Sequence, residues 1–179
     1  NKELADLIQA LGCGSGDRFA EEKLRYERVI IMTDADVDGA HIASLLMTFF
    51  FREMPGLVAN GKLFLAMPPL YRLTQGSQTV YARDDAHKDE LMKTSFKSAK
   101  GKVEVSRFKG LGEMPSAQLR ETTMDPAKRT LLRVTLPDQK DRGDYKKTVS
   151  LVESLMGRKP ELRFDFIQKN AKFVRDLDV

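Results

Sequence analysis

A short apolar run that ends in three closely spaced carboxylates constrains this chain more than any other feature. Residues 29–33 read Val-Ile-Ile-Met-Thr, a stretch typical of a buried strand. Asp34, Asp36 and Asp38 follow, and at a turn their side chains can converge on one point. Three carboxylates that close repel one another strongly unless a cation lies between them. Hard oxygen ligands favour Mg²⁺ or Mn²⁺ over zinc, so the sequence predicts a divalent-metal site of the kind that acts on phosphates.

Three other interpretations account for less of this acidic cluster. A calcium-binding EF-hand loop needs a glutamate at its twelfth position, where Leu45 stands, and a helix rather than a strand before the loop. An aspartate-based phosphatase also begins with a strand and Asp-x-Asp, but its pattern wants threonine or valine where Asp38 stands. A helix N-cap would explain Asp38 alone and leave the other two carboxylates unexplained.

Composition limits the class of protein without defining it. The 179 residues are 41% hydrophobic and 31% charged, which suits one folded domain, alone or with a helical extension. The net charge of +4 permits contact with nucleic acid but does not establish it. Cys13 is the only cysteine, so the chain has no internal disulfide and suits a reducing compartment. Residues 45–51 are the most apolar stretch, too short for a bilayer, and predict a buried helix.

The order of the expected elements favours an α/β fold. A strand at 29–33, a helix at 41–54 and a strand at 62–67 suggest a parallel βαβ unit. Sites in such sheets gather at the carboxyl ends of the strands, where the acidic cluster lies. The other expected elements are a helix at 1–11, a helical turn at 21–26, a hairpin of 71–73 with 79–81, a helix at 84–95, a strand at 103–108, a helix at 115–121, a strand at 131–136 and helices at 145–156 and 161–177.

Two further segments carry residues suited to phosphate chemistry. Residues 109–114 read Lys-Gly-Leu-Gly-Glu-Met between a strand and a helix, and their glycines allow close backbone approach or positive φ. Lys109 offers a cation and Glu113 a carboxylate, which can contact a phosphate backbone, support the metal site or simply form an exposed turn. The same alternatives apply to Arg120. His41 lies within about one helical turn of Asp38 and can act as an outer donor or as an ordinary structural histidine.

Several segments together resemble the Toprim region of bacterial type IIA topoisomerase B subunits. They are residues 31–42, 68–71, 107–114 and 118–126, with 166–171 similar to the C-terminal end of those subunits. The motifs occur in family order and cover nearly the whole chain. The resemblance implies an α/β Toprim fold, Rossmann-like, with a mostly parallel sheet flanked by helices. It places the Toprim domain at 1–125 and, at 126–179, a strand and helical tail that docks on the A subunit.

Two subfamilies fit this resemblance, the B subunit of topoisomerase IV and that of gyrase. Only about 25 residues separate Tyr81 from Arg107, which leaves no room for the large insertion of some gyrases. The sequence therefore leans toward topoisomerase IV, with gyrase as the alternative. An Asp-x-Asp phosphotransfer enzyme and a non-catalytic docking module are more distant alternatives.

The resemblance also implies a mechanism and partners. An ATP-dependent holoenzyme, an A2B2 heterotetramer with the topoisomerase A subunit, cuts double-stranded DNA with an A-subunit tyrosine and passes a second duplex through the break. Asp34 and Asp36 would be catalytic and hold Mg²⁺, for which Mn²⁺ or Ca²⁺ can substitute, with Asp38 assisting directly or through water. The residues expected to bind DNA or support the site are His41, Lys109, Gly112, Glu113 and Arg120. Such a protein would be cytoplasmic, associated with the nucleoid and independent of membranes.

Some segments of the family do not occur between the first and last residues of this sequence. The family's Glu-Gly-Asp-Ser motif, the Pro-Leu-(Arg/Lys)-Gly-Lys segment after it and the upstream ATPase region are missing, and the chain starts at Asn1 without a methionine. We therefore expect an N-terminally truncated Toprim domain that lacks its first strand and a catalytic glutamate. ATP would bind only in the upstream domain, and this chain alone would be inactive.

Overall fold

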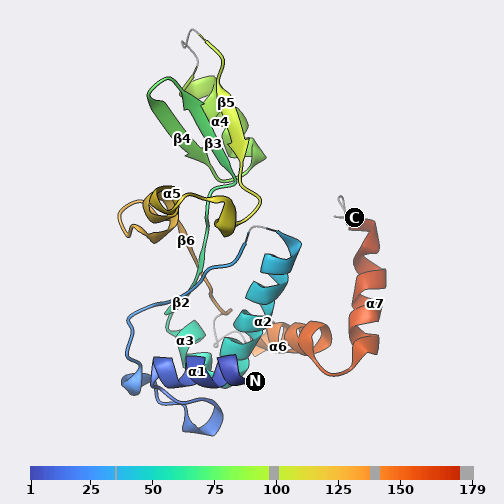
Figure 1. Ribbon diagram of the computed structural model, residues 1–179. Coiled ribbons are helices and arrows are strands. Elements are labelled where there is room, and N and C mark those ends of the chain that lie inside the picture. The colour runs from blue at the N-terminus through green and yellow to red at the C-terminus, as the bar shows by residue number, and fades with distance from the viewer. Residues whose placement is uncertain (35, 97–100, 138–141, 174–179) are drawn as a thin grey trace. The chain divides into compact units, whose positions relative to one another are not determined.

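The chain folds into two compact units that share several elements. The computed structural model describes residues 1–34, 36–96, 101–137 and 142–173. One unit comprises Asn1–Val29, Ser44–Leu63 and Arg133–Val179, and the other comprises Ile30–Ala43 and Phe64–Leu132. We call them the terminal unit and the central unit. The helix α2 (Val37–Glu53) runs from the central unit into the terminal unit (Figure 1).

The terminal unit begins with the predicted N-terminal helix, α1 (Lys2–Leu11). The Asn1 side chain caps it by accepting hydrogen bonds from the amides of Glu3 and Leu4 at 2.9 and 3.4 Å. Gly12 ends it with a φ of 75°, a left-handed conformation that favours glycine. The 3-10 turns η1 (Gly16–Arg18) and η2 (Glu21–Lys23) follow, so the expected helical turn at 21–26 is present in a shorter form.

The predicted helix at 41–54 exists as α2 but begins at Val37 and is less buried than expected. Phe50 is 1% exposed, whereas Leu45 is 49% exposed. Successive helical residues point in different directions, so a continuous apolar run cannot bury every side chain against one core. The expectation of a buried helix therefore holds for only one face of α2. Pro55 starts the next helix, α3 (Pro55–Ala59), at a position that needs no amide hydrogen.

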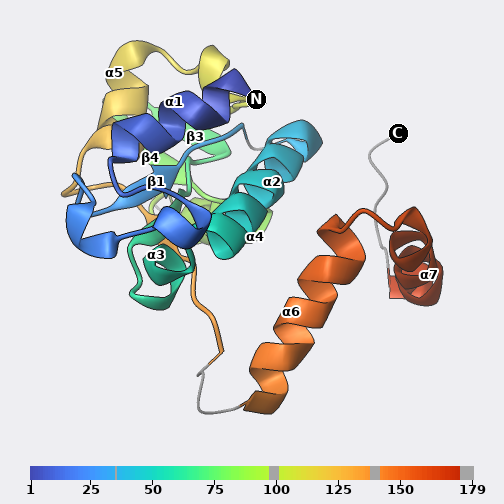
Figure 2. The same cartoon turned by 90° about the horizontal axis from the view of Figure 1, so that it is seen from below.

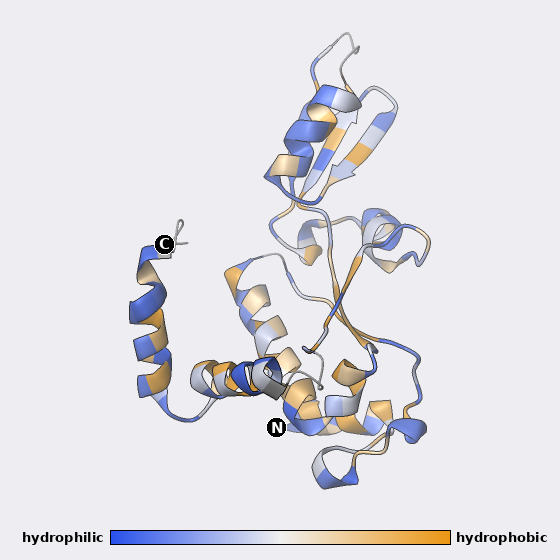
Figure 3. Ribbon diagram, turned by 180° about the vertical axis from the view of Figure 1, so that it is seen from behind, coloured by the Kyte–Doolittle hydropathy of each residue, from blue (hydrophilic) through white to orange (hydrophobic). Residues whose placement is uncertain are grey.

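The C-terminal helices belong to the terminal unit and correspond to the helices predicted at 145–156 and 161–177. They are α6 (Arg142–Met156) and α7 (Pro160–Asn170), joined by a short turn (Figure 2) and followed by the 3-10 turn η5 (Ala171–Phe173). Both carry hydrophilic and hydrophobic residues along their length (Figure 3). The predicted helix at 161–177 extends beyond the described residues.

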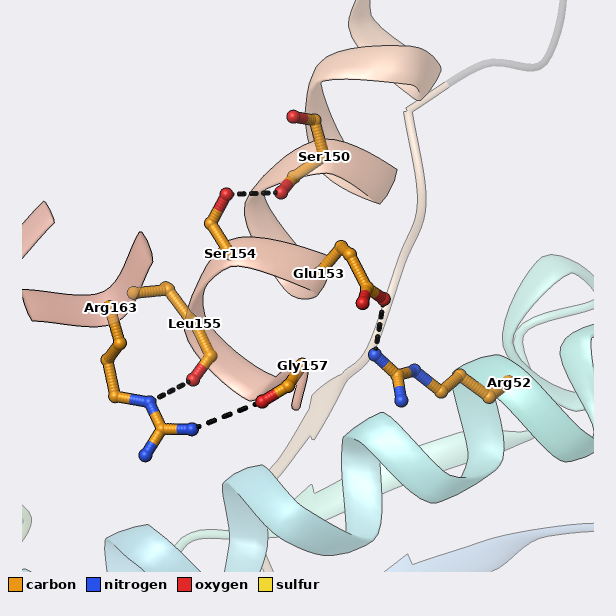
Figure 4. A network of polar contacts seen from close by, with 7 residues as sticks. All are labelled: Arg52, Ser150, Glu153, Ser154, Leu155, Gly157 and Arg163. Carbon is orange, nitrogen blue, oxygen red and sulfur yellow. Dashed lines mark hydrogen bonds and ion pairs between the residues drawn. The ribbon is translucent and has the colours of Figure 1, made fainter. Parts of the chain in front are cut away.

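Polar contacts around the end of α6 tie it to its neighbours (Figure 4). The Arg163 guanidinium donates to the carbonyl oxygens of Leu155 and Gly157 at 2.7 and 3.4 Å, which satisfies the C-terminal end of the helix. Arg52 of α2 pairs with Glu153 at 2.7 Å. Because both side chains of that pair are exposed, it stabilises the fold by no more than about 1 kcal/mol.

Three short strands pass from one unit into the other. They are β1 (Val29–Ile31), β2 (Leu63–Ala66) and β6 (Leu131–Arg133), in the order β1-β2-β6. Each one confirms a predicted strand but is shorter than expected. The helix α2 connects β1 to β2, as the βαβ prediction requires.

The second sheet lies wholly in the central unit and is antiparallel. It contains β3 (Tyr71–Gln75), β4 (Gln78–Ala82) and β5 (Glu104–Arg107) in the order β4-β3-β5 (Figure 1). In the register, Tyr71 pairs with Ala82 on one side and with Arg107 on the other. Gly76 turns the predicted hairpin with a φ of 57°. A two-residue connection joins strands in the antiparallel sense, so this sheet is the predicted hairpin with β5 added to β3.

The helix α4 (Asp85–Thr94) packs against this sheet and covers a core of Tyr71, Leu73, Ala82 and Phe96. The Tyr71 hydroxyl donates to Asp85 at 2.9 Å, and Lys88 donates to the same oxygen at 2.6 Å. The hydrogen bond from Lys88, followed by that from Tyr71, lowers the pKa of Asp85. After β5 the chain forms η3 (Leu111–Glu113), α5 (Ser116–Leu119) and a π-helical turn, η4 (Arg120–Met124).

We expect Asp84→Ala to lower the free energy of unfolding by about 1 kcal/mol, because it removes the cap of α4. Asp84 accepts a hydrogen bond from the His87 amide at 2.7 Å. Urea unfolding followed by circular dichroism measures the change. Asp89→Ala is the matched control, since it removes a carboxylate inside the same helix and should not destabilise it. Equal stabilities of the two variants would contradict the capping role.

Candidate metal centre

The three carboxylates lie between the end of β1 and the first turn of α2, and all three are exposed. Asp36 accepts a hydrogen bond from the Gly39 amide at 2.7 Å and therefore occupies the capping position of α2. The suggestion that Asp38 caps this helix is wrong, because the helix begins at Val37 and Asp38 lies in its first turn. A negative charge there is still favourable next to the helix dipole.

Asp34 is held by a segment that lies about eighty residues later in the chain. The amide of Leu111 donates to Asp34 Oδ1 at 2.7 Å. Gly110 approaches the same carboxylate so closely that an added Cβ would lie 3.0 Å from Asp34 Cγ. The φ of Gly110 is −161°, an extended conformation open to any residue, so the close approach is what requires glycine here. Of the alternatives left open for the Lys-Gly-Leu-Gly-Glu segment, this contact favours support of the acidic cluster.

The loop that touches Asp34 is closed by its own residues. The Lys109 amide donates to the Glu113 carboxylate at 2.8 Å, and η3 forms the turn between them. The side chains of Lys109 and Glu113 are exposed, as is Gly112, where an added Cβ would meet nothing within 4 Å. Glu113 therefore has a structural task in this loop, and Lys109 keeps its ammonium group at the surface.

A cavity of about 250 Å³ opens beside Asp34 within the central unit. Its walls come from the ends of β1 and β2, from Ala43 of α2 and from Pro68, Leu70 and Arg83. Most of this lining is apolar. Among the described residues, its only charged side chains are the negative Asp34 and the positive Arg83. A carboxylate at the rim of such a cavity is exposed enough to bind a cation and fixed enough to have one orientation.

The carboxylates fit a magnesium-type cation in donor chemistry, but they do not form a complete cage. No group of three or more histidine, cysteine, aspartate or glutamate side chains able to hold a metal occurs in the described part of the chain. Asp34 and Asp36 each use one oxygen for a backbone amide and keep the other. Mg²⁺ usually takes one or two protein carboxylates and fills its other positions with water and substrate phosphates, so these two side chains suit it.

The other predicted site residues are not brought to Asp34 by any contact among the residues that the structure describes. His41 lies exposed in the first half of α2, and Arg120 lies exposed at the start of η4. Sequence reasoning missed two groups, the Leu111 amide, which donates to the Asp34 carboxylate, and Arg83, which lines the same cavity as Asp34. No residue type marks a backbone amide that will donate to a distant carboxylate, so the sequence could not indicate it. Arg83 stands directly after β4, and that position could have indicated it.

Two known families match this chain over separate parts. The Toprim domain matches residues 2–67, and the family described as DNA gyrase B subunit, carboxyl terminus, matches residues 100–168. Toprim domains of type II topoisomerases bind divalent metal ions. The acidic cluster therefore lies inside the Toprim match and Gly110 and Leu111 inside the other one.

Related proteins extend these matches over the whole chain. The B subunit of DNA topoisomerase 4 from Caulobacter vibrioides is 64% identical over 180 residues, and that from Bartonella bacilliformis is 60% identical over 179. Each alignment covers 100% of this chain and 25% of the relative. The DNA gyrase B subunit of Halalkalibacterium halodurans is 49% identical over 179 residues, which cover 100% of this chain and 27% of the relative.

The fold and the acidic cluster thus define a Toprim protein. The chain belongs to the B-subunit family of bacterial type II topoisomerases, and among the relatives given above those of topoisomerase IV are more similar to it than that of gyrase. It spans about a quarter of the length of the curated relatives that it matches. None of the helices in the described ranges is long and apolar enough to cross a membrane.

Proposed function

We propose that this chain is the metal-binding part of the B subunit of a topoisomerase IV, an ATP-dependent enzyme that cleaves and reseals double-stranded DNA. The observation that carries the proposal is the contact between Asp34 and the Leu111 amide, which joins two motifs of the family at one carboxylate. The identity of 64% to a topoisomerase IV relative supports that assignment over gyrase, at 49%.

In this proposal Asp34 and Asp36 hold Mg²⁺, and Asp38 assists directly or through water. The ion would stabilise negative charge on the scissile phosphate and on the leaving oxygen of the DNA strand. The chain's own residues orient the ligands: the Leu111 amide fixes Asp34, and the Gly39 amide fixes Asp36 at the start of α2. The tyrosine that attacks the DNA would come from the A subunit.

We propose supporting roles for five exposed residues. The exposed cations Lys109 and Arg120 would contact DNA phosphates, and His41 would act as an outer donor. Glu113 would keep the loop closed through the Lys109 amide, and the open space at Gly112 would let a DNA backbone approach.

We also propose that residues 126–179 dock on the A subunit and that residues 1–125 are the Toprim part. The resulting complex would contain two copies of each subunit. The relatives extend well beyond the length matched here, and we place ATP binding in that remaining part.

The experiment that tests this function combines the full-length B subunit with its A subunit, ATP and Mg²⁺. Interlinked DNA circles and relaxed plasmid are offered as substrates. Efficient unlinking without negative supercoiling is the expected result, because that pair of activities defines a topoisomerase IV. ATP-driven negative supercoiling would select gyrase instead, and no change in either DNA would overturn both assignments.

A further inference from the structure

A second cavity in the central unit is larger and more polar than the one at Asp34. Its volume is about 400 Å³, which falls in the range of roughly 300–1,000 Å³ common for ligand sites. One wall comes from β4, α4 and the residues between them, and another from the stretch that includes η4 and the turn before β6. Its lining residues are Met67, Pro69, Tyr81, Arg83, His87, Glu121, Thr122, Lys128 and Thr130.

Groups that donate hydrogen bonds or carry positive charge dominate this lining. The Arg83 side chain has no ion pair or hydrogen bond within the described ranges and keeps all its donors available. The Arg83 amide donates to His87 Nδ1 at 3.3 Å, so a neutral His87 carries its proton on Nε2 and can donate from there. Lys128 adds a second cation, and the hydroxyls of Tyr81 and Thr130 complete the set, whereas the Thr122 hydroxyl already donates to the Gln118 carbonyl at 2.8 Å.

The single carboxylate of the lining is already partly neutralised. Glu121 lies 3.5 Å from the Lys128 ammonium group. Burial, followed by repulsion from Glu121, raises the pKa of Tyr81, so its hydroxyl stays protonated and able to donate. On the neighbouring strand, Arg72 Nε is buried without a hydrogen-bond partner among the described residues, which leaves a further donor group next to Tyr81.

This cavity adjoins the one at Asp34. Met67 and Arg83 line both of them, so Arg83 is common to the cavity beside Asp34 and to the donor-rich pocket. Arginine suits such a position because its planar fork of donors matches the oxygens of a phosphate group. A DNA strand that reaches the cavity at Asp34 would therefore also meet the positive charge of Lys128, which lines the adjoining cavity.

We propose that the cavity lined by Tyr81, Arg83, His87 and Lys128 binds a phosphate group of the DNA backbone, next to the phosphate that a metal ion at Asp34 would contact. Phosphate is favoured over a carboxylate or an apolar ligand because several donors and two cations converge there with only one, ion-paired, carboxylate. The assignment to DNA rests on the proposed function, whereas the phosphate chemistry rests on the lining alone.

The test measures how DNA binding by the assembled A and B subunits depends on salt. A fluorescently labelled duplex is titrated at several NaCl concentrations with EDTA present, so that the metal site takes no part. Loss of one phosphate contact should reduce the slope of log K against log salt by about 0.9 and weaken binding about fivefold at 0.15 M NaCl. We expect this change for Arg83→Gln and in the same direction for Lys128→Gln. Arg83→Lys should restore the slope, since it keeps the charge.

Lys93→Gln is the matched control, because it removes an exposed cation of α4 that does not line the cavity. An unchanged slope for Arg83→Gln, or an equal change for Lys93→Gln, would overturn the proposal. Binding of inorganic phosphate, followed by ³¹P NMR, distinguishes the source of the anion. Phosphate binding that depends on Arg83 together with an unchanged DNA slope would mean a site for a free anion and would overturn the DNA assignment.

The test of the phosphate site and the test of the proposed function can fail independently of one another. If Asp34→Ala leaves DNA cleavage intact while Arg83→Gln changes the salt slope, the metal assignment fails and the phosphate site stands. The reverse pair of results would retain the metal assignment and reject the phosphate site.

Discussion

If the chain has the proposed function, replacing Asp34 by alanine in the complex of A and B subunits is expected to reduce Mg²⁺-dependent DNA cleavage by at least about a hundredfold. Metal stabilisation of charge in the transition state is worth several kcal/mol, and each 1.4 kcal/mol corresponds to about tenfold in rate. Asp36→Ala should have a similar effect. Cleavage of a labelled duplex in a single turnover measures the rate, and DNA binding measured in parallel should change little.

The control for Asp34 separates its charge from its hydrogen bond. Asp34→Asn keeps an oxygen that can accept from the Leu111 amide but removes the negative charge. We expect it to lose cleavage nearly as completely as Asp34→Ala while retaining wild-type stability. Asp38→Ala should have a smaller effect, because its assigned role is assistance. Full cleavage by a double variant of Asp34 and Asp36 would reject the metal centre and favour a docking role for the chain.

Local features that have a local physical cause could be predicted from the sequence. The helix expected at 1–11, the hairpin of 71–73 with 79–81 and the helix expected at 84–95 all formed as predicted. Each depends on residues within a few positions of one another. The predicted ends of the strands were less accurate, because a strand extends only as far as its neighbour offers backbone hydrogen-bond partners.

Features that depend on long-range packing could not be predicted to the same extent. The sequence indicated which residues of α2 are apolar but not which of them face the core, so the 49% exposure of Leu45 was unexpected. It indicated the carboxylates of the site and the glycine-rich loop as separate motifs. Their contact requires Asp34 and Leu111 to meet across 77 residues, and the donor is a backbone amide that every residue except proline possesses.

Gly110→Ala provides the sharpest test of that contact. The new Cβ would lie 3.0 Å from Asp34 Cγ and 3.1 Å from Oδ1, which is closer than a comfortable carbon–oxygen contact. The carboxylate or the loop must therefore shift. A displacement of about 1 Å at a catalytic group can cost as much as a hundredfold in rate. Contacts of 3.0 to 3.1 Å require a shift of only a few tenths of an ångström, so we expect cleavage to fall by roughly three- to tenfold. Because Gly110 has an extended backbone, the free energy of unfolding should change by less than about 1 kcal/mol.

Gly112→Ala is the matched control in the same loop. Its added methyl group meets nothing within 4 Å, and Gly112 does not have a positive φ, so the loop and Asp34 should keep their positions. A loss of cleavage in Gly110→Ala but not in Gly112→Ala would show that the loop acts by placing Asp34. The opposite result, with Gly112→Ala impaired and Gly110→Ala active, would mean that the loop acts by contacting DNA. The role of Asp34 would then not depend on its hydrogen bond to Leu111.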